Sequence, residues 1–327
     1  MITLKEAYKD YFYIGAACHA AGIETHRDLL TTQFSSMTCE NEMKHESLAV
    51  APGKYDFSVA DKMVSFAKTN GMQMRGHCFV WHAQTAPFMY QKEDGSYVSR
   101  DELILAMKNH IKVCSEHFGD QINAYDVVNE AIDDKHGLFL RKSFWTEIIG
   151  DDFIDIAFKA AYESNPDKKL FYNDYNETDP VKCEKIVKLI KGMQERDIPV
   201  SGLGLQSHYD ITTANFDNIE RALEKYANLG VDLHVTELDF SPRSPEDKDI
   251  SITSPTKEMV ELTADFYEKY FKLLRQYKDA VKSVTLWGIA DDHTWLNNFP
   301  VEGRRAWPML FDENHKPKEA FYRVVQF

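Results

Sequence analysis

Short apolar runs alternate with longer amphipathic segments along the whole chain. Eight of the runs have the length and composition expected of buried strands. They begin at Tyr13, Ser36, Met72, Asn123, Lys169, Gly202, Val231 and Ser283. Successive starts lie roughly 20 to 50 residues apart, which is enough for a strand, a helix and two loops. The pattern therefore predicts one strand–helix unit repeated eight times.

The segments between the runs carry helix signals. Residues 101–118 place apolar side chains three or four positions apart, at Leu103, Met107, Ile111, Cys114 and Phe118. Ser99 and Glu102 have the spacing of a capping box, and Gly119 marks the end of the helix. The same periodicity recurs before Gly230, at Ile219, Leu223 and Tyr226.

The alternation also predicts the fold class. A strand followed each time by a helix implies a parallel sheet, and eight such units favour a closed (β/α)8 barrel over a doubly wound sheet. The 327 residues contain no linker rich in Pro, Gly or Ser. We therefore expect residues 1–327 to form a single barrel domain.

Composition narrows the range of partners. Acidic residues outnumber basic ones by 52 to 38, which gives a net charge of −14. This balance argues against binding to nucleic acid or to an anionic membrane and favours a neutral ligand. The five cysteines are widely spaced and include no C-x-x-C motif, which predicts reduced thiols: Cys18, Cys39, Cys78, Cys114 and Cys183.

The N-terminal segment predicts a cytoplasmic protein. Its sequence, MITLKEAYKDYFYIGAA, has Lys, Glu and Asp where a signal peptide needs an apolar core. No later run approaches the length of a membrane span. The sequence leaves open whether the protein is a monomer or a homodimer.

Most of the predicted strands end in polar or aromatic side chains. In a parallel barrel all strands end on one face, where active sites are built, so residues far apart in sequence should converge there. These strand-end residues are Glu40, Asn41, His77, Asn129, Glu130, Asn173, Asp174, Gln206, His208, Glu237, Asp239 and Trp287.

The sequence lacks the motifs of nucleotide-binding proteins and of enzymes with a serine or cysteine nucleophile. There is no G-x-x-x-x-G-K-[ST], and Gly202-Leu-Gly204 lacks the third glycine of a dinucleotide fingerprint, so we expect a tight strand entry there. There is also no G-x-S-x-G elbow and no recognisable cysteine nucleophile motif.

A metal centre is the less favoured alternative. Four histidines, His77, His82, His208 and His234, lie on or just after predicted strands, as in barrel metallohydrolases. Those enzymes usually present two inward histidines at positions i and i+2, whereas the nearest pair here is His77 and His82, and HExxH is absent. We therefore expect neither a metal nor another cofactor.

Two carboxylates remain as the candidate catalytic groups. Glu130 and Glu237 each end a predicted strand, and two facing carboxyl groups are the apparatus of glycoside hydrolysis. Glu237 has the alternation parity of Val235 and Glu130 that of Val128, so both could face the lumen. One glutamate would be protonated and the other ionised, roughly 5 to 5.5 Å apart if configuration is retained.

Aromatic and polar side chains beside the strand ends suit a sugar. The C–H groups of a sugar ring pack on aromatic faces, and its hydroxyls need fixed donors and acceptors. The aromatic candidates are Trp81, Tyr175, Trp287 and Trp295. The polar candidates are Lys44, His82, Asn129 and Gln206.

Seven segments of the chain form a recognisable series: TCENEMK (38–44), RGHCFVWH (75–82), YDVVNEA (125–131), FYNDYN (171–176), GLGLQSH (202–208), HVTELD (234–239) and LWGIADDHTWL (286–296). Through these segments, which stand in the family's order, nearly the whole chain resembles the glycoside hydrolase family 10 endo-β-1,4-xylanases, and within that family the small intracellular xylanases. It departs at two positions: His45 stands where the family usually has an aromatic residue, and Ala83 where it commonly has Asn or Ser.

The resemblance implies a role for each matching residue. Glu130 would be the general acid/base and Glu237 the nucleophile of a retaining reaction, with His208 orienting Glu237 and Gln206 beside Glu130. Asn129 and His82 would bind hydroxyls next to the cleaved bond. The remaining implied contacts are Glu40, Asn41 and Lys44 on the distal sugar, Trp287 as a stacking floor, Trp295 as a lid and Tyr175 as a platform on the leaving side; His77 and Trp81 complete the expected sugar-binding set.

The implied substrate is a xylo-oligosaccharide or a fragment of xylan, with no carbohydrate-binding module on the chain. Two alternatives stay open. One is a barrel glycosidase with the same carboxylate pair that cleaves a β-glucan, and the other is a non-catalytic sugar-binding barrel. The presence of both Glu130 and Glu237 disfavours the second.

Overall fold

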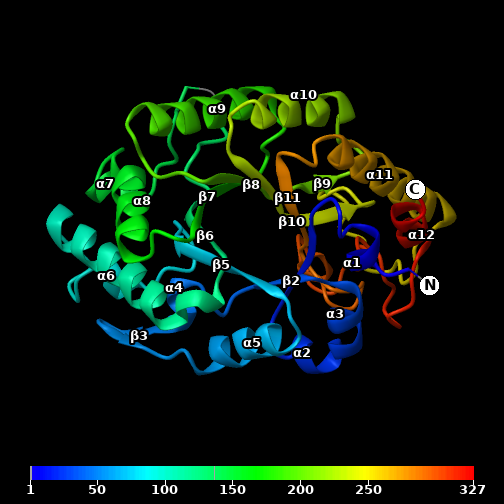
Figure 1. Ribbon diagram of the computed structural model, residues 1–327, viewed down its shortest axis with the longest axis horizontal. Coiled ribbons are helices and arrows are strands. Elements are labelled where there is room, and N and C mark those ends of the chain that lie inside the picture. Colours follow the sequence, from blue (N-terminus) through cyan, green and yellow to red (C-terminus); the bar gives the residue numbers. More distant parts are fainter. Residues whose placement is uncertain (1, 136) are drawn as a thin grey trace.

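A closed barrel of eight parallel strands forms the centre of the protein (Figure 1). The computed structural model describes residues 2–135 and 137–327. Pairing of β10 with β11 and of β11 with β1 closes the barrel, which confirms the predicted (β/α)8 fold. In order around the barrel the strands are β1 (Tyr13–Cys18), β2 (Ser36–Cys39), β5 (Gln73–Val80), β6 (Ala124–Asn129), β7 (Lys169–Asp174), β8 (Gly202–Leu205), β10 (Asp232–Ser241) and β11 (Val281–Leu286).

Helices surround the barrel (Figure 1). The longer ones are α5 (Ser58–Thr69), α6 (Arg100–Phe118), α8 (Phe153–Ser164), α9 (Pro180–Glu195), α10 (Phe216–Ala227) and α11 (Lys257–Gln276). The shorter ones are α1 (Leu4–Ala7), α2 (Gly22–Thr25), α3 (Arg27–Gln33), α4 (His45–Leu48), α7 (Phe144–Ile148), α12 (Glu319–Val325) and the 3-10 turns η1 (Pro87–Met89), η2 (Gly119–Gln121) and η3 (Trp295–Asn297). The two ends of the chain meet, because the Tyr8 hydroxyl donates to the Val324 carbonyl at 2.6 Å.

Helix α6 shows why the apolar periodicity was informative. The five side chains that the pattern selected on this helix are all buried. Ser99 and Glu102 form the predicted capping box, and Gly119 ends the helix with a φ of +49°. Burial of one face and capped ends are the two conditions that an amphipathic helix needs on a barrel surface.

Two short additions interrupt the regular alternation. Strands β3 (Ala49–Ala51) and β4 (Lys54–Tyr55) form an antiparallel pair between β2 and α5. Strand β9 (His208–Asp210) is an addition to the eight barrel strands. It pairs with the C-terminal end of β10, where His208 is the partner of Asp239. The second addition places a histidine at the barrel mouth.

Gly202, the first residue of β8, and Gly204 both pack closely against the neighbouring strand β7. A Cβ on Gly204 would lie 2.2 Å from Oδ1 of Asn173, and a Cβ on Gly202 would lie 2.2 Å from the Phe171 ring. Both contacts are far below a real Cβ contact. The two glycines of β8 therefore leave room for side chains of the neighbouring strand β7.

We expect Gly204→Ala to lower the free energy of unfolding by about 1 to 3 kcal/mol, because the added methyl overpacks the barrel interior. It should also lower activity, since Asn173 must move. Urea unfolding and hydrolysis rates measure the two effects. The control is Gly192→Ala in α9, where the new Cβ meets only the end of Arg196. Stability there should stay unchanged or rise by up to about 1 kcal/mol, and equal behaviour of the two variants would contradict the argument.

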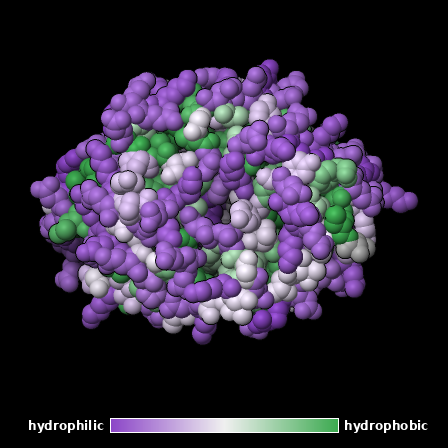
Figure 2. All heavy atoms as spheres, in the orientation of Figure 1, coloured by the Kyte–Doolittle hydropathy of each residue, from purple (hydrophilic) through white to green (hydrophobic). Residues whose placement is uncertain are grey.

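The surface and the thiols agree with the composition. Hydrophilic residues cover most of the face seen in Figure 2. All five cysteines are free and buried, as predicted. Within the described ranges, no helix combines the length and the apolar character that a membrane span requires.

Candidate active site

A cleft of about 490 Å³ opens at the carboxyl ends of the barrel strands. It brings together every predicted site residue except His82, which lies 3.9 Å from a Glu130 oxygen. The predicted residues that line it are Glu40, Asn41, Lys44, His77, Trp81, Asn129, Glu130, Tyr175, Gln206, His208, Glu237, Trp287 and Trp295. Gln84, Asn176 and Phe299 also line the cleft, although the sequence argument did not select them.

Glu237 is held as a buried carboxylate. Asn173 Nδ2 donates to its Oε1 at 2.8 Å, and His208 Nε2 donates to its Oε2 at 3.2 Å. Burial alone would raise the pKa of Glu237, but the His208 hydrogen bond and the nearby histidine charges outweigh it, so the pKa lies below its usual value. Glu237 is therefore ionised at neutral pH.

His208 carries the positive charge next to Glu237. Its Nδ1 donates to Asp239 Oδ2 at 2.8 Å, so both ring nitrogens serve as donors. Burial would lower the pKa of His208, but the charge of Asp239 and the bonds to both carboxylates raise it to about 10. Trp295 Nε1 donates to the same Asp239 oxygen at 2.7 Å, which ties the predicted lid to this group.

This arrangement predicts a pH-dependent stability. The folded pKa of His208, about 10, exceeds the unfolded value of about 6.5. Its stabilisation is therefore complete below about pH 6.5 and lost as the pH rises through about 10. We expect His208→Gln to lower the free energy of unfolding by about 1.5 to 3 kcal/mol at pH 6, and the deficit should shrink towards pH 10. Urea unfolding across this range measures it, and a deficit independent of pH would contradict the assignment.

Asn173 is the central residue that the sequence argument left without a role. Its Nδ2 donates to Asn129 Oδ1 at 2.9 Å as well as to Glu237, and its Oδ1 accepts from Thr236 Oγ1 at 2.7 Å. It is fully buried at the end of β7. Its place among the polar strand ends was the available signal, but a buried Asn that joins two strands cannot be told from a capping Asn in sequence.

Strand alternation is not what brings Glu237 into the cleft. Residues 236 and 237 both contact Asn173, whereas neighbours on a regular strand point to opposite faces. The pairing of β10 with β11 shifts register between Val235 and Leu238. This irregularity, rather than the parity with Val235, re-aims the carboxylate.

Glu130 lies across the cleft in a different environment. Trp81 Nε1 donates to its Oε2 at 2.9 Å, and Gln206 Nε2 donates to its Oε1 at 3.1 Å. The nearest histidine is His82, whose pKa burial lowers to about 4, so this ring is neutral at neutral pH. The Glu237 carboxylate thus accepts from a charged histidine, whereas Trp81 and Gln206, which donate to the Glu130 carboxyl, are neutral, and this is the contrast that an acid and a nucleophile require.

The backbone at Glu130 aims its side chain. The residue has a φ of +57°, in the left-handed region that is uncommon for side chains other than Gly, Asn and Asp. Its N–H donates to the Asn173 carbonyl at 2.9 Å, and its carbonyl accepts from Arg141 Nε at 3.0 Å. Bonds on both sides hold the unusual conformation, a pattern common at functional sites.

One end of the cleft is a polar network after β2. Lys44 Nζ donates to Asn41 Oδ1 at 3.0 Å and to Gln84 Oε1 at 2.8 Å, and it lies 4.9 Å from the centre of the Trp81 ring. Burial raises the pKa of Glu40 at the same end. These side chains are fixed before any ligand arrives, which suits recognition of sugar hydroxyls.

The other end and the walls are aromatic. The Tyr175 hydroxyl donates to Asp134 Oδ2 at 2.5 Å, and Lys182 Nζ lies 3.8 Å from its ring centre, so one ring face is already covered. Trp287 packs edge-on against His77 at 5.4 Å, and Trp295 packs against Phe299 at 4.8 Å. Only the free aromatic faces are available for stacking on a sugar.

The four barrel histidines lie in different surroundings. His77 Nδ1 bonds Asp126 at 3.0 Å, and His234 Nδ1 faces Arg75 at 2.6 Å, so both belong to one buried network, whose His77 also lines the cleft. His208 bonds Glu237 and Asp239, and His82 lies 3.9 Å from the Glu130 carboxyl on the other side of the cleft. Among the described residues, none of these four belongs to a cluster of metal-ligating side chains.

His45 fills the position where an aromatic residue is usual. It is buried, its Nδ1 accepts the Ala86 N–H at 3.0 Å, and its ring packs edge-on against His110 at 4.7 Å. Burial lowers the pKa of His45 to about 4, so the ring is neutral. His45 therefore makes both an aromatic contact and a hydrogen bond at this position.

A parallel barrel with two glutamates at its mouth, one ionised and one among neutral donors, defines a glycoside hydrolase site. The chain belongs to glycosyl hydrolase family 10, whose model matches residues 3–327.

Similar proteins of known name and a similar solved structure support this family assignment. The chain is 48% identical to "Endo-1,4-beta-xylanase A" of Caldicellulosiruptor saccharolyticus, over 100% of this chain and 96% of the relative. It is 45% identical to "Endo-1,4-beta-xylanase" of Geobacillus stearothermophilus, over 99% and 98%. It resembles the crystal structure of xylanase XynB from Paenibacillus barcinonensis in complex with a conduramine derivative, with a TM-score of 0.97, 43% identity and coverage of 99% and 98%.

Proposed function

We propose that the protein is a retaining endo-1,4-β-xylanase with Glu237 as nucleophile and Glu130 as general acid/base. The observation that carries the proposal is the unequal environment of the two glutamates. His208 and Asn173 hold Glu237 ionised, whereas Trp81 and Gln206 offer Glu130 only neutral donors. Full-length similarity to proteins named endo-1,4-β-xylanase supports the choice of substrate.

The reaction follows from these environments. Glu237 attacks the anomeric carbon while the carboxyl proton of Glu130 moves to the leaving oxygen, which gives a glycosyl-enzyme ester. Glu130, now ionised, removes a proton from water as the water attacks the same carbon and Glu237 leaves, so the configuration is retained. The Trp81 and Gln206 donors can bond Glu130 in both its protonated and its ionised form.

The two ends of the cleft support a division of sugar contacts. Glu40, Asn41 and Lys44 would hold the distal sugar, and Tyr175 would face the leaving portion. Trp287 and Trp295 would enclose the reacting ring, while Asn129 and His82 would bind its hydroxyls. Because Trp295 is tethered to Asp239, the lid shares a hydrogen-bonded chain with the nucleophile.

The deciding experiment is time-resolved NMR of xylo-oligosaccharide cleavage, with cello-oligosaccharides of equal length as the control. We expect β-anomeric products first and faster cleavage of the xylose series. A first product of α configuration would exclude the double displacement. Faster cleavage of the cellulose series would favour the β-glucan alternative.

We further propose an intracellular role on short xylo-oligosaccharides. Five free and buried cysteines fit a reducing compartment, where disulfides are rare. Fractionation of the source cells followed by detection of the protein tests the location. Recovery from the culture medium would contradict it.

A further inference from the structure

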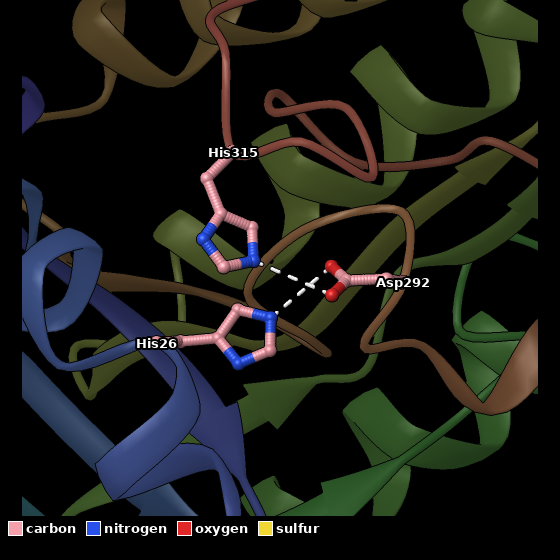
Figure 3. A group of neighbouring side chains, drawn as sticks. All are labelled: His26, Asp292 and His315. Carbon is pink, nitrogen blue, oxygen red and sulfur yellow. Dashed lines mark hydrogen bonds and ion pairs between the residues drawn. The ribbon is translucent and has the colours of Figure 1, made fainter.

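Two histidines and an aspartate converge outside the active-site cleft (Figure 3). His26 directly precedes α3, Asp292 lies in the loop after β11, and His315 lies in the turn before α12. Their ligand atoms all lie within 4.8 Å of one another. In the part of the chain that the structure describes, no other group of three or more His, Cys, Asp or Glu side chains meets this condition.

The separations between these atoms suit a small divalent cation. His26 Nε2 lies 3.1 Å from Asp292 Oδ1, and His315 Nε2 lies 3.3 Å from Asp292 Oδ2. A four-coordinate zinc ion bound at about 2.0 to 2.2 Å keeps its ligand atoms about 3.3 to 3.5 Å apart. The two histidine nitrogens thus flank one carboxylate, and the three ligand atoms, which lie within 4.8 Å of one another, would share one ion after closing to these separations.

The other nitrogen of the His26 ring is also held in place. His26 Nδ1 lies 2.8 Å from the Thr25 hydroxyl, which in turn bonds the Ala21 carbonyl at 3.1 Å. His26 Nε2 faces the Asp292 carboxylate at 3.1 Å, and a bound cation would take the place of the proton in this hydrogen bond. A ring fixed by its second nitrogen is typical of metal ligands.

An ion can also reach the cluster. A surface hollow of about 550 Å³, lined by Glu24, Asn314 and others, includes His26 and His315 in its wall. The His26 side chain is 5% exposed, whereas those of Asp292 and His315 are 38% and 35% exposed. The cluster thus has one buried anchor and two side chains at the solvent, which leaves a position for water.

We propose that His26, Asp292 and His315 form a structural zinc site. Two imidazoles and one carboxylate, completed by water, are a ligand set that suits zinc. The ion would join three segments that are distant in sequence: the start of α3, the loop after β11 and the C-terminal turn. None of its ligands lines the catalytic cleft, so its effect is on stability rather than on the reaction.

Addition of zinc sulfate to protein treated with a chelator tests the site. We expect one zinc ion per chain by calorimetry and a rise in Tm of roughly 4 °C at a free zinc concentration about 100 times the Kd. Bound Co²⁺ should give the visible absorption of a four-coordinate site. Hydrolysis well below the Tm should not change when zinc is removed, which separates this site from the proposed catalytic residues.

Matched variants assign the ligands. Asp292→Asn and His315→Gln should each lose the zinc-dependent rise in Tm and the Co²⁺ absorption. The control is His117→Gln, because His117 pairs with Asp61 at 2.7 Å on the surface without a third ligand, and this variant should bind zinc normally. Absence of a zinc effect in the unmodified protein, or full zinc binding by Asp292→Asn, would overturn the proposal.

Discussion

Glu237→Ala should lower kcat by at least about 10⁴-fold on every xyloside, whatever the leaving group, because no covalent intermediate can form. Steady-state rates on xylotriose and on an activated aryl xyloside measure this loss. Azide should partly restore turnover of the activated substrate, since a small anion fits where the carboxylate was. The product should then be an α-glycosyl azide, because attack comes from the nucleophile's side.

A matched control separates chemistry from binding. Glu40→Gln changes another acid of the same cleft, one that is partly buried and that we place at the distal sugar. It should raise KM with a far smaller loss of kcat. If Glu40→Gln and Glu237→Ala lose kcat equally, or if azide yields a β product from Glu237→Ala, the assignment of the nucleophile is wrong.

Glu130→Ala should give a loss that depends on the leaving group. A xyloside with a poor leaving group needs the acid proton, so kcat/KM should fall by about 10² to 10⁴-fold. A dinitrophenyl xyloside needs no proton, so its first step should proceed nearly as before, and an initial burst of phenolate should precede slow turnover. Stopped-flow absorbance measures the burst.

Azide distinguishes the two glutamates in the same assay. In Glu130→Ala, azide should replace water in the second step and give a β-glycosyl azide, because the ester to Glu237 has already inverted the centre once. An equal loss of kcat/KM on both classes of leaving group would argue that Glu130 is not the acid. This outcome would leave the role of Glu237 untouched.

The stretch YDVVNEAID illustrates how far sequence reasoning reaches. An N-cap at Asn129 with Glu130 in a first helical turn is the simplest local interpretation of these residues. In the structure no helix begins there, since the next helix after β6 starts at Phe144. Instead Asn129 accepts from Asn173, and Glu130 turns into the cleft with a positive φ. Contacts with strands that are distant in sequence therefore override the local tendency of these residues to begin a helix.

The residues at the barrel mouth could be predicted from the sequence, but the hydrogen bonds between them could not. Parallel strands end on one face, so polar strand ends must gather there once the barrel is accepted. The partners of Glu237, however, come from β7 and β9, and its direction depends on the register shift in β10. Neither these hydrogen-bond partners nor the register shift can be recognised from the pattern of apolar and polar residues along the chain.

The sequence by itself determined the eight strand–helix units, the capped helix α6 and the set of polar strand ends, because each depends on the period of neighbouring residues. Only the tertiary structure decided that Gly204 makes room for Asn173, that His208 carries a charge between two carboxylates, and that His26 meets Asp292 and His315. These features depend on the distance and solvation between residues remote in the chain, which are fixed only when the barrel closes.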